Sequence, residues 1–139
     1  MAFRGTHEHT VDDRGRVALP ARYRHELAEG IVLTVGPEGC IEIYTTSGFA
    51  EMSDLVAAEP STTLAGRQSR RRFDSQSWDA ELDGQGRILI PARFREAAGL
   101  QGPVIIAGRR ECLEIWSPEG WQQALQDAMP SSAGPGSQE

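Results

Sequence analysis

Lysine is absent from this chain of 139 residues, so all fourteen of its basic residues are arginine. Cysteine is scarce as well. Cys40 and Cys112, with no CxxC pair, are too few for a disulfide scaffold, and we expect both to be buried as small apolar side chains. Of three histidines, His7 and His9 lie near the N-terminus. Because no third ligand is close to them, they predict exposed strand positions rather than a metal site.

Long apolar runs are also missing. No segment is long enough to cross a bilayer, and the N-terminal segment MAFRGTHEHT lacks the apolar centre of a signal peptide. The hydrophobic content of 39% and the charged content of 24% are typical of a globular protein. The sequence therefore predicts a cytoplasmic protein that does not contact a membrane.

The net charge of −6 argues against nucleic-acid binding by the chain as a whole. The distribution of charge matters more than its sum. Seven of the arginines, but only three acidic residues, lie in two segments, residues 12–24 and 83–95. A basic surface on an otherwise acidic body is therefore expected.

These two segments are copies of one motif. Residues 12–24 read DDRGRVALPARYR and residues 83–95 read DGQGRILIPARFR, with seven of thirteen positions identical. The shared frame is Asp-x-x-Gly-Arg, three apolar residues, then Pro-Ala-Arg-aromatic-Arg. Asp and Gly between two extended segments predict a tight hairpin turn. The proline then ends the strand and can begin a short helix.

The residues around each motif repeat as well. After residues 12–24 comes an apolar strand at 31–35, a turn, and an alternating strand Ile-Glu-Ile-Tyr that is expected to be half-buried. Thr45 and Ser117 are predicted helix caps. Each copy of about 50 residues is marginal as a separate domain, so the copies are expected to share one core. The predicted fold class is α+β, mainly β, with short helices.

The chain divides into four segments by this pattern. They are a first unit (3–56), a basic connector (57–73), a second unit (74–129) and a polar tail (130–139) that its composition predicts to be disordered.

Enzymatic interpretations find little support. No Ser-His-Asp or Cys-His arrangement is visible, Gly84-Gln85-Gly86 lacks the residues of a phosphate-binding loop, and Asp12-Asp13 is a pattern that suits a turn. The sequence predicts no catalytic residues, no cofactor and no metal.

Arginine beside a hairpin turn favours DNA binding instead. A two-stranded ribbon fits the major groove, and an arginine there can bind O6 and N7 of guanine together. Arg14 and Arg16 in the first copy and Arg87 in the second are placed for this contact. Asp12 and Asp83 are expected to brace the turns or to orient the arginines, because phosphate would repel them.

The chain resembles the MraZ family of bacterial transcription regulators, which is related to AbrB/SpoVT-type swapped-hairpin proteins. The residues that carry the resemblance are Phe3, Gly5, the paired Asp-x-x-x-Arg motifs, both Pro-Ala-Arg-aromatic-Arg segments, and the strands Ile-Glu-Ile-Tyr and Leu-Glu-Ile-Trp. Order, spacing and length agree from Phe3 to about Trp121.

The resemblance implies a tandem, pseudo-symmetric swapped-hairpin barrel of the double-psi or AbrB type, and subunits that close into a ring. It also implies a repressor of the division and cell-wall gene cluster, including its own gene, that reads tandem guanine-rich promoter repeats in the nucleoid. The positions carried over are Asp12, Arg14, Arg16, Asp83 and Arg87. Gln85 is the neutral counterpart of Arg14, so the second copy is expected to bind more weakly or to read a different base edge.

Three questions stay open in the sequence. Arg70, Arg71 and Arg72 are either a solvated face or phosphate contacts beside the main surface. Trp78, Trp116 and Trp121 are candidates for either a subunit interface or the core. The alternative function is an antitoxin-like or other protein-interaction module, although such proteins usually have one swapped-hairpin unit and a long partner-binding tail.

Overall fold

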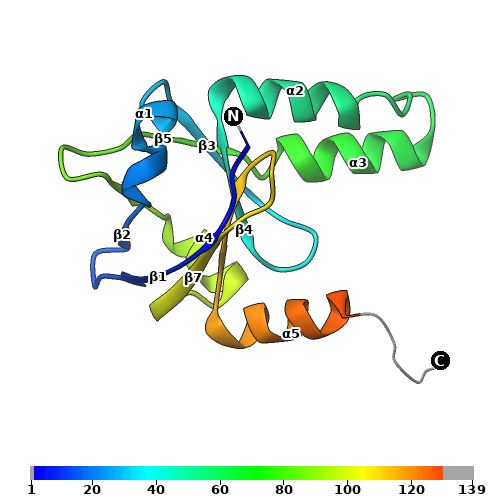
Figure 1. The fold of residues 1–139 in the computed structure, drawn as a ribbon. Coiled ribbons are helices and arrows are strands. Elements are labelled where there is room, and N and C mark those ends of the chain that lie inside the picture. The colour runs from blue at the N-terminus through cyan, green and yellow to red at the C-terminus, as the bar shows by residue number, and fades with distance from the viewer. Residues whose placement is uncertain (1, 130–139) are drawn as a thin grey trace.

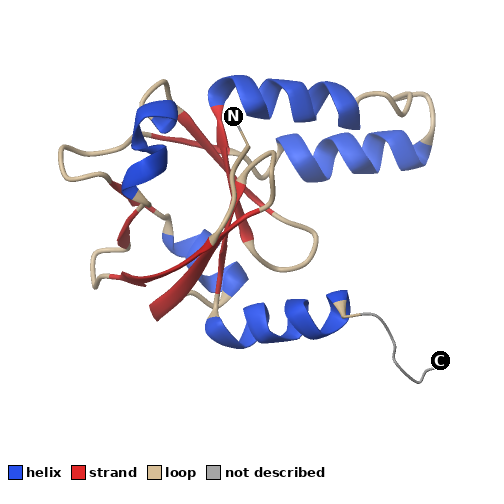
Figure 2. Ribbon diagram, in the orientation of Figure 1, coloured by secondary structure: helices blue, strands red, loops and turns tan. Residues whose placement is uncertain are grey.

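The structure is a computed structural model that describes residues 2–129, and its fold class is α+β, as predicted (Figure 1). The predicted tail lies outside the described residues. A mostly antiparallel sheet carries the fold, and residues 2–129 contain five α-helices and one 3-10 helix (Figure 2). The strands are β1 (Thr6–Val11), β2 (Arg16–Ala18), β3 (Ile31–Val35), β4 (Ile41–Thr45), β5 (Trp78–Ala80), β6 (Arg87–Leu89), β7 (Gly102–Gly108) and β8 (Leu113–Trp116). The helices are η1 (Ala21–Tyr23), α1 (Arg24–Leu27), α2 (Thr46–Val56), α3 (Leu64–Asp74), α4 (Ala92–Ala98) and α5 (Pro118–Ala128).

Strands of the two repeats pair across the repeat boundary. The larger sheet has the order β1-β7-β8-β4-β3-β5, so β1 of the first repeat pairs with β7 of the second, and β5 of the second pairs with β3 of the first. The smaller sheet is the ribbon β2-β6, again one strand from each repeat. Among residues 2–129 no strand pairing joins the ribbon to the larger sheet, so the closed swapped-hairpin barrel stays a prediction.

One apolar core serves both repeats, as the small size of each copy predicted. It combines equivalent residues of the two motifs, such as Val17 with Ile88 and Tyr23 with Phe94, all of which are buried. The alternation along β2 and β6 turns Val17 and Ile88 inward, and Tyr23 and Phe94 reach the core from η1 and α4. Neither repeat could bury its strands alone.

The alternating strands are more deeply buried than the sequence predicts. Residues 41–44 of β4 and all of β8 are buried, including Glu42 and Glu114. The prediction that these strands are half-buried is therefore wrong. The reason is that helices cover the second face of the sheet: Phe49 of α2 packs on Tyr44, and Trp121 of α5 packs on Trp116.

The predicted helix caps are confirmed. The Thr45 side chain accepts a hydrogen bond from the amide of Gly48 at 2.9 Å, and the Ser117 side chain accepts one from Gly120 at 3.0 Å. Both cysteines are free and buried, as expected.

The connector contains a helix that the sequence analysis did not predict. Thr63 caps α3, and Phe73 anchors it by stacking on Phe49 at 4.8 Å with an interplanar angle of 8°. Helices α2 and α3 thus form a hairpin that extends from the sheet, whereas α5 lies apart from it (Figure 1).

Candidate nucleic-acid interface

The first Asp-x-x-Gly-Arg motif folds into a tight turn around one carboxylate. Oδ1 of Asp12 accepts hydrogen bonds from the backbone amides of Arg14 and Arg16, both at 2.9 Å. The amide of Gly15 donates to the carbonyl of Asp12 at 3.0 Å, and Gly15 has a φ of +82°, which glycine adopts without a steric penalty. These bonds hold the pKa of Asp12 below its ordinary value, the Arg16 amide being the main cause.

The second motif repeats this turn and adds an ion pair. Oδ1 of Asp83 accepts from the amides of Gln85 and Arg87 at 2.8 and 3.0 Å. Nε of Arg87 also donates to Oδ2 of Asp83 at 3.0 Å, and Nη1 lies 4.0 Å from Oδ2 of Asp12. The backbone bond from Arg87 is the first cause of the lowered pKa of Asp83. Both aspartates therefore brace their turns, and Asp83 orients Arg87 as well.

The two turns hold each other in place. Directly after β2, the amide of Leu19 donates to the carbonyl of Gly86 at 3.0 Å, and directly after β6, that of Ile90 donates to the carbonyl of Gly15 at 2.8 Å. Each turn glycine is thus hydrogen-bonded to the residue that follows the ribbon strand of the other repeat.

The last arginine of each Pro-Ala-Arg-aromatic-Arg segment completes this cross-brace. Nε of Arg24 donates to the carbonyl of Leu19 at 3.0 Å, and its guanidinium lies directly against Gly86 of the other repeat. Nε of Arg95 donates to the carbonyl of Ile90 at 2.9 Å, and its guanidinium lies against Gly15. A Cβ atom at Gly15 would lie 2.9 Å from Nε of Arg95, which is too close. These arginines position the turns, a role that the sequence analysis did not identify.

The remaining predicted residues differ in side-chain exposure and in their ion-pair partners. The side chains of Arg14 and Gln85 are exposed at the tips of their turns, and Arg16 is half-buried. Among residues 2–129, Arg16 has no ion-pair partner within 4 Å, in contrast to Arg87. The structure therefore brings Asp12, Asp83 and Arg87 together and leaves the guanidinium groups of Arg14 and Arg16 available for an external anion or base.

The three connector arginines lie on α3, in different environments. Arg70 donates hydrogen bonds to the carbonyls of Ala57 and Glu59, the shortest at 2.7 Å, and so ties α3 to the end of α2. Its guanidinium is already used within the fold, which argues against Arg70 as a phosphate contact. Arg71 and Arg72 are exposed.

A buried polar cluster lies on the sheet face that the helices cover. Glu42 and Glu114 are direct cross-strand neighbours on β4 and β8, and Nη1 of Arg109 donates to both carboxylates, at 2.7 and 2.8 Å. The Tyr44 hydroxyl and the Trp116 indole NH donate to their second oxygens, at 3.0 and 2.9 Å. The repetition of Glu in the two Ile-Glu-Ile and Leu-Glu-Ile strands was the available signal for this cluster.

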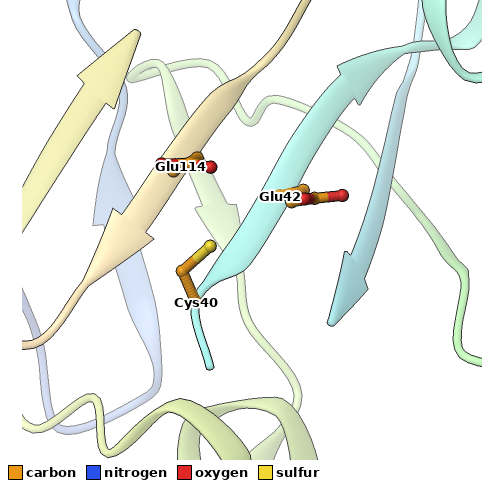
Figure 3. A group of neighbouring side chains, drawn as sticks. All are labelled: Cys40, Glu42 and Glu114. Carbon is orange, nitrogen blue, oxygen red and sulfur yellow. The ribbon is translucent and has the colours of Figure 1, made fainter. Parts of the chain in front are cut away.

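Cys40, Glu42 and Glu114 are close enough together to be tested as a metal site (Figure 3). The donor set does not fit. Both carboxylates already bind the Arg109 guanidinium, and burial raises the pKa of the Cys40 thiol, so the thiolate that a metal requires is disfavoured. Burial likewise raises the pKa of Cys112 to about 12.

A hollow of about 500 Å³ elsewhere on the surface has four glutamates and one arginine as its charged lining residues. Its lining residues include Glu26, Glu29, Glu51, Arg110 and Glu111. An acidic lining repels phosphate, so this hollow does not suit nucleic acid. No helix within residues 2–129 has the length and apolar character needed to span a membrane.

The comparisons with known proteins agree on one family. The family profile described as "MraZ protein, putative antitoxin-like" matches residues 2–72 and 76–136. A protein of Roseiflexus castenholzii named "Transcriptional regulator MraZ" is 43% identical over 131 residues, which cover 94% of this chain and 91% of the relative. Proteins of the same name from Roseiflexus sp. strain RS-1 and Moorella thermoacetica are 44% identical (94% of this chain and 91% of the relative) and 40% identical (87% and 85%).

Proposed function

The chain belongs to the MraZ family, and from this membership we propose that it is a sequence-specific DNA-binding regulator of transcription. The relatives' shared name describes a regulator, which is not an enzyme class. The observation that carries the proposal is the pair of cross-braced turns, each of which presents an arginine after an aspartate that fixes its backbone. Arginines whose backbone is held in place at a ribbon end suit the major groove of B-DNA.

The proposed reading residues are Arg16 and Arg87, with Arg14 and Gln85 at the tips of their turns. Asp83 holds the Arg87 side chain in a fixed orientation. The two Nη atoms of Arg87 can therefore face a guanine with little loss of side-chain conformational entropy. Arg14 adds a second cation to the first turn, where Gln85 adds none, so the first turn should contribute more of the affinity.

The finer parts of the proposal come from the resemblance. We infer that the regulator is a repressor, that its sites are tandem guanine-rich repeats upstream of its own gene and of the division and cell-wall cluster, and that it acts in the nucleoid. We also infer a barrel completed from both repeats and a ring of identical subunits. Several turns on one ring would add their affinities only where the DNA repeats match their spacing.

Fluorescence anisotropy with DNA from the upstream region of this gene, against a scrambled duplex, tests the proposal. Wild-type protein should prefer the native sequence, and Arg16→Ala with Arg87→Ala should abolish that preference. Arg22→Ala is the matched control, because Arg22 is an exposed arginine outside the turns. Equal binding of both duplexes would mean that the protein binds DNA without sequence specificity, which would contradict the proposal.

The role of Arg14 can be separated in the same assay. If Arg14 contacts phosphate, Arg14→Ala should weaken binding to both duplexes alike and reduce the salt slope by about one unit. If Arg14 reads a base, the same change should relax the preference for the native duplex.

The second candidate is an antitoxin-like module whose main partner is a protein, which the wording of the family description favours. Absence of binding to either duplex by a folded protein, together with capture of a protein encoded beside this gene, would select this function over the first.

A further inference from the structure

The β2-β6 ribbon has two different faces. Val17 of β2 pairs with Ile88 of β6, and each of these side chains is only 1% exposed in the core. Because successive residues of a strand point to opposite faces, the residues on either side of this pair point away from the core. These residues are Arg16, Ala18, Arg87 and Leu89, and we call them the ribbon face.

The ribbon face contains an exposed leucine. Leu89 is 46% exposed, whereas Val17 and Ile88, the other large apolar residues of the ribbon, are buried. An isolated apolar side chain on a protein surface is common and does not by itself indicate a function. The position of Leu89 does, because it lies beside an arginine that is proposed above to read DNA.

The strand register places Leu89 directly opposite Arg16. Side chains of such a cross-strand pair lie on the same face, with their Cβ atoms about 4.5–5.5 Å apart. Successive bases along one strand of B-DNA are about 3.4 Å apart. When Arg16 binds one base, Leu89 is therefore within reach of the adjoining base pair.

The side chains of this pair suit two different bases in the major groove. Arginine can donate hydrogen bonds to O6 and N7 of guanine, and an apolar side chain can contact the C5-methyl group of thymine. The side chain of Leu89 has no hydrogen-bonding group, so the thymine methyl group is the base feature that it can recognise. Contact between the two groups removes apolar surface of both from water, which favours binding.

We propose that Leu89 is a specificity-determining residue, which contacts the methyl group of a thymine next to the guanine that Arg16 binds. This proposal rests on the DNA-binding function proposed above. The equivalent residue of the first repeat is Ala18, which lies opposite Arg87 and has a side chain that ends at Cβ. The requirement for thymine should therefore be strong beside Arg16 and weak beside Arg87.

Deoxyuridine tests the contact, because it pairs as thymidine does but lacks the methyl group. Fluorescence anisotropy would compare the upstream duplex of this gene with a uracil duplex, in which deoxyuridine replaces every thymidine. Wild-type protein should bind the uracil duplex about fourfold more weakly for each methyl group that Leu89 buries. Leu89→Ala should bind the two duplexes with nearly equal affinity. Equal binding of both duplexes by wild-type protein would overturn the proposal.

Leu64→Ala is the matched control, because Leu64 is an exposed leucine of α3, outside the ribbon. It should bind both duplexes as wild-type protein does. If Leu89 instead supports the fold or contacts another protein molecule, Leu89→Ala should weaken binding to both duplexes alike. The ratio of the two affinities would then stay at its wild-type value, which would contradict the proposal.

Single substitutions in the DNA test whether the two bases are neighbours, and they do not depend on the folding of a Leu89 variant. 7-Deazaguanine lacks N7, so a guanine bound by Arg16 is one whose replacement weakens binding by wild-type protein but not by Arg16→Ala. The thymine whose replacement by deoxyuridine weakens binding most should adjoin such a guanine. A separation of more than one base pair would contradict the proposed geometry.

Failure of this proposal can be distinguished from failure of the proposed function. A protein that binds the upstream and scrambled duplexes alike has no sequence specificity, and both proposals would then be wrong. A protein that prefers the upstream duplex but does not distinguish thymine from uracil reads DNA without Leu89. Only the role of Leu89 would then be wrong.

Discussion

Arg16 and Arg87 hold the same position in the repeat but have different neighbours. Arg87 is bound by Asp83 and lies near Asp12, whereas Arg16 has no ion pair among the described residues. The arginine of the second turn therefore has a fixed orientation, and that of the first turn has more rotational freedom. A guanidinium group with a fixed orientation favours geometric selectivity for one base. A guanidinium group that can rotate favours adaptable contacts.

The lowered pKa of Asp83 should depend mostly on the hydrogen bonds that its carboxylate accepts from backbone amides. The amide of Arg87 is its first cause, ahead of the Arg87 side chain. In Arg87→Ala, the pKa should therefore rise only in part and stay below its ordinary value, as carboxyl carbon titration by NMR would measure. A complete return to the ordinary value would contradict this prediction.

The same shift has a pH consequence. A depressed carboxyl pKa stabilises the folded turns above the unfolded-state pKa of about 3.9, and this contribution is lost as the pH falls through the lower folded-state pKa. The free energy of unfolding should therefore decrease as the pH is lowered below about 4. Asp12→Asn should make this decrease smaller.

At the scale of elements, the cross-brace uses both ends of the thirteen-residue motif. Its first half makes a turn, and its last arginine packs on the turn of the other repeat. The hairpin turns were predictable because Asp-x-x-Gly-Arg is a local signal. The contacts of Arg24 and Arg95 were not predictable, because each arginine packs on the turn of the other repeat.

Two neighbouring glycines of the second turn should respond differently to substitution. Gly86 has a φ of +75° and lies directly against Arg24, whereas a Cβ at Gly84 would meet nothing within 4 Å. Gly86→Ala should cost at least about 1 kcal/mol, the usual penalty for a side chain in the left-handed region. Gly84→Ala should change stability by less than about 0.5 kcal/mol in urea denaturation.

Helix α3 shows where local sequence reasoning reaches its limit. Its four arginines predict only a basic segment, and the helix depends on the Thr63 cap and on the stacking of Phe73 with Phe49, residues that are far apart in the sequence. Arg70 was interpreted with Arg71 and Arg72 because they are adjacent, but helical geometry points Arg70 at the end of α2.

Arg70→Ala and Arg71→Ala should therefore differ although each removes one charge. Arg70→Ala removes the hydrogen bonds to Ala57 and Glu59 and should lower the free energy of unfolding by about 1–3 kcal/mol. Arg71→Ala changes an exposed side chain and should stay within about 0.5 kcal/mol. Equal losses in denaturant titration would mean that Arg70 is not a structural brace.

At the scale of the whole molecule, the shared core could be predicted from the sequence. The burial of two glutamates on the other face of the sheet could not. The alternation of Glu with Ile suggested exposed glutamates, yet the helices bury both and make Arg109 their common counter-ion. That burial follows from tertiary packing, which alternation alone does not report.

Arg109→Met should be strongly destabilising. It leaves Glu42 and Glu114 side by side without a cation, and removal of one partner from a buried charge network costs about 3–5 kcal/mol. Glu42→Gln with Glu114→Gln in the same chain should restore much of the lost stability, as thermal unfolding would show. A triple variant no more stable than Arg109→Met would argue that Arg109 acts by packing alone.

The pairing of strands across the repeat boundary also constrains how this sequence can change over generations. Gly15 is restricted by Arg95, and Gly86 by Arg24, so the half of the gene that encodes one turn sets which codons the other half can accept. A change of sequence in one turn must therefore retain its fit to the arginine of the other repeat. A larger residue at either glycine would require a compensating change at the arginine encoded in the other half of the gene.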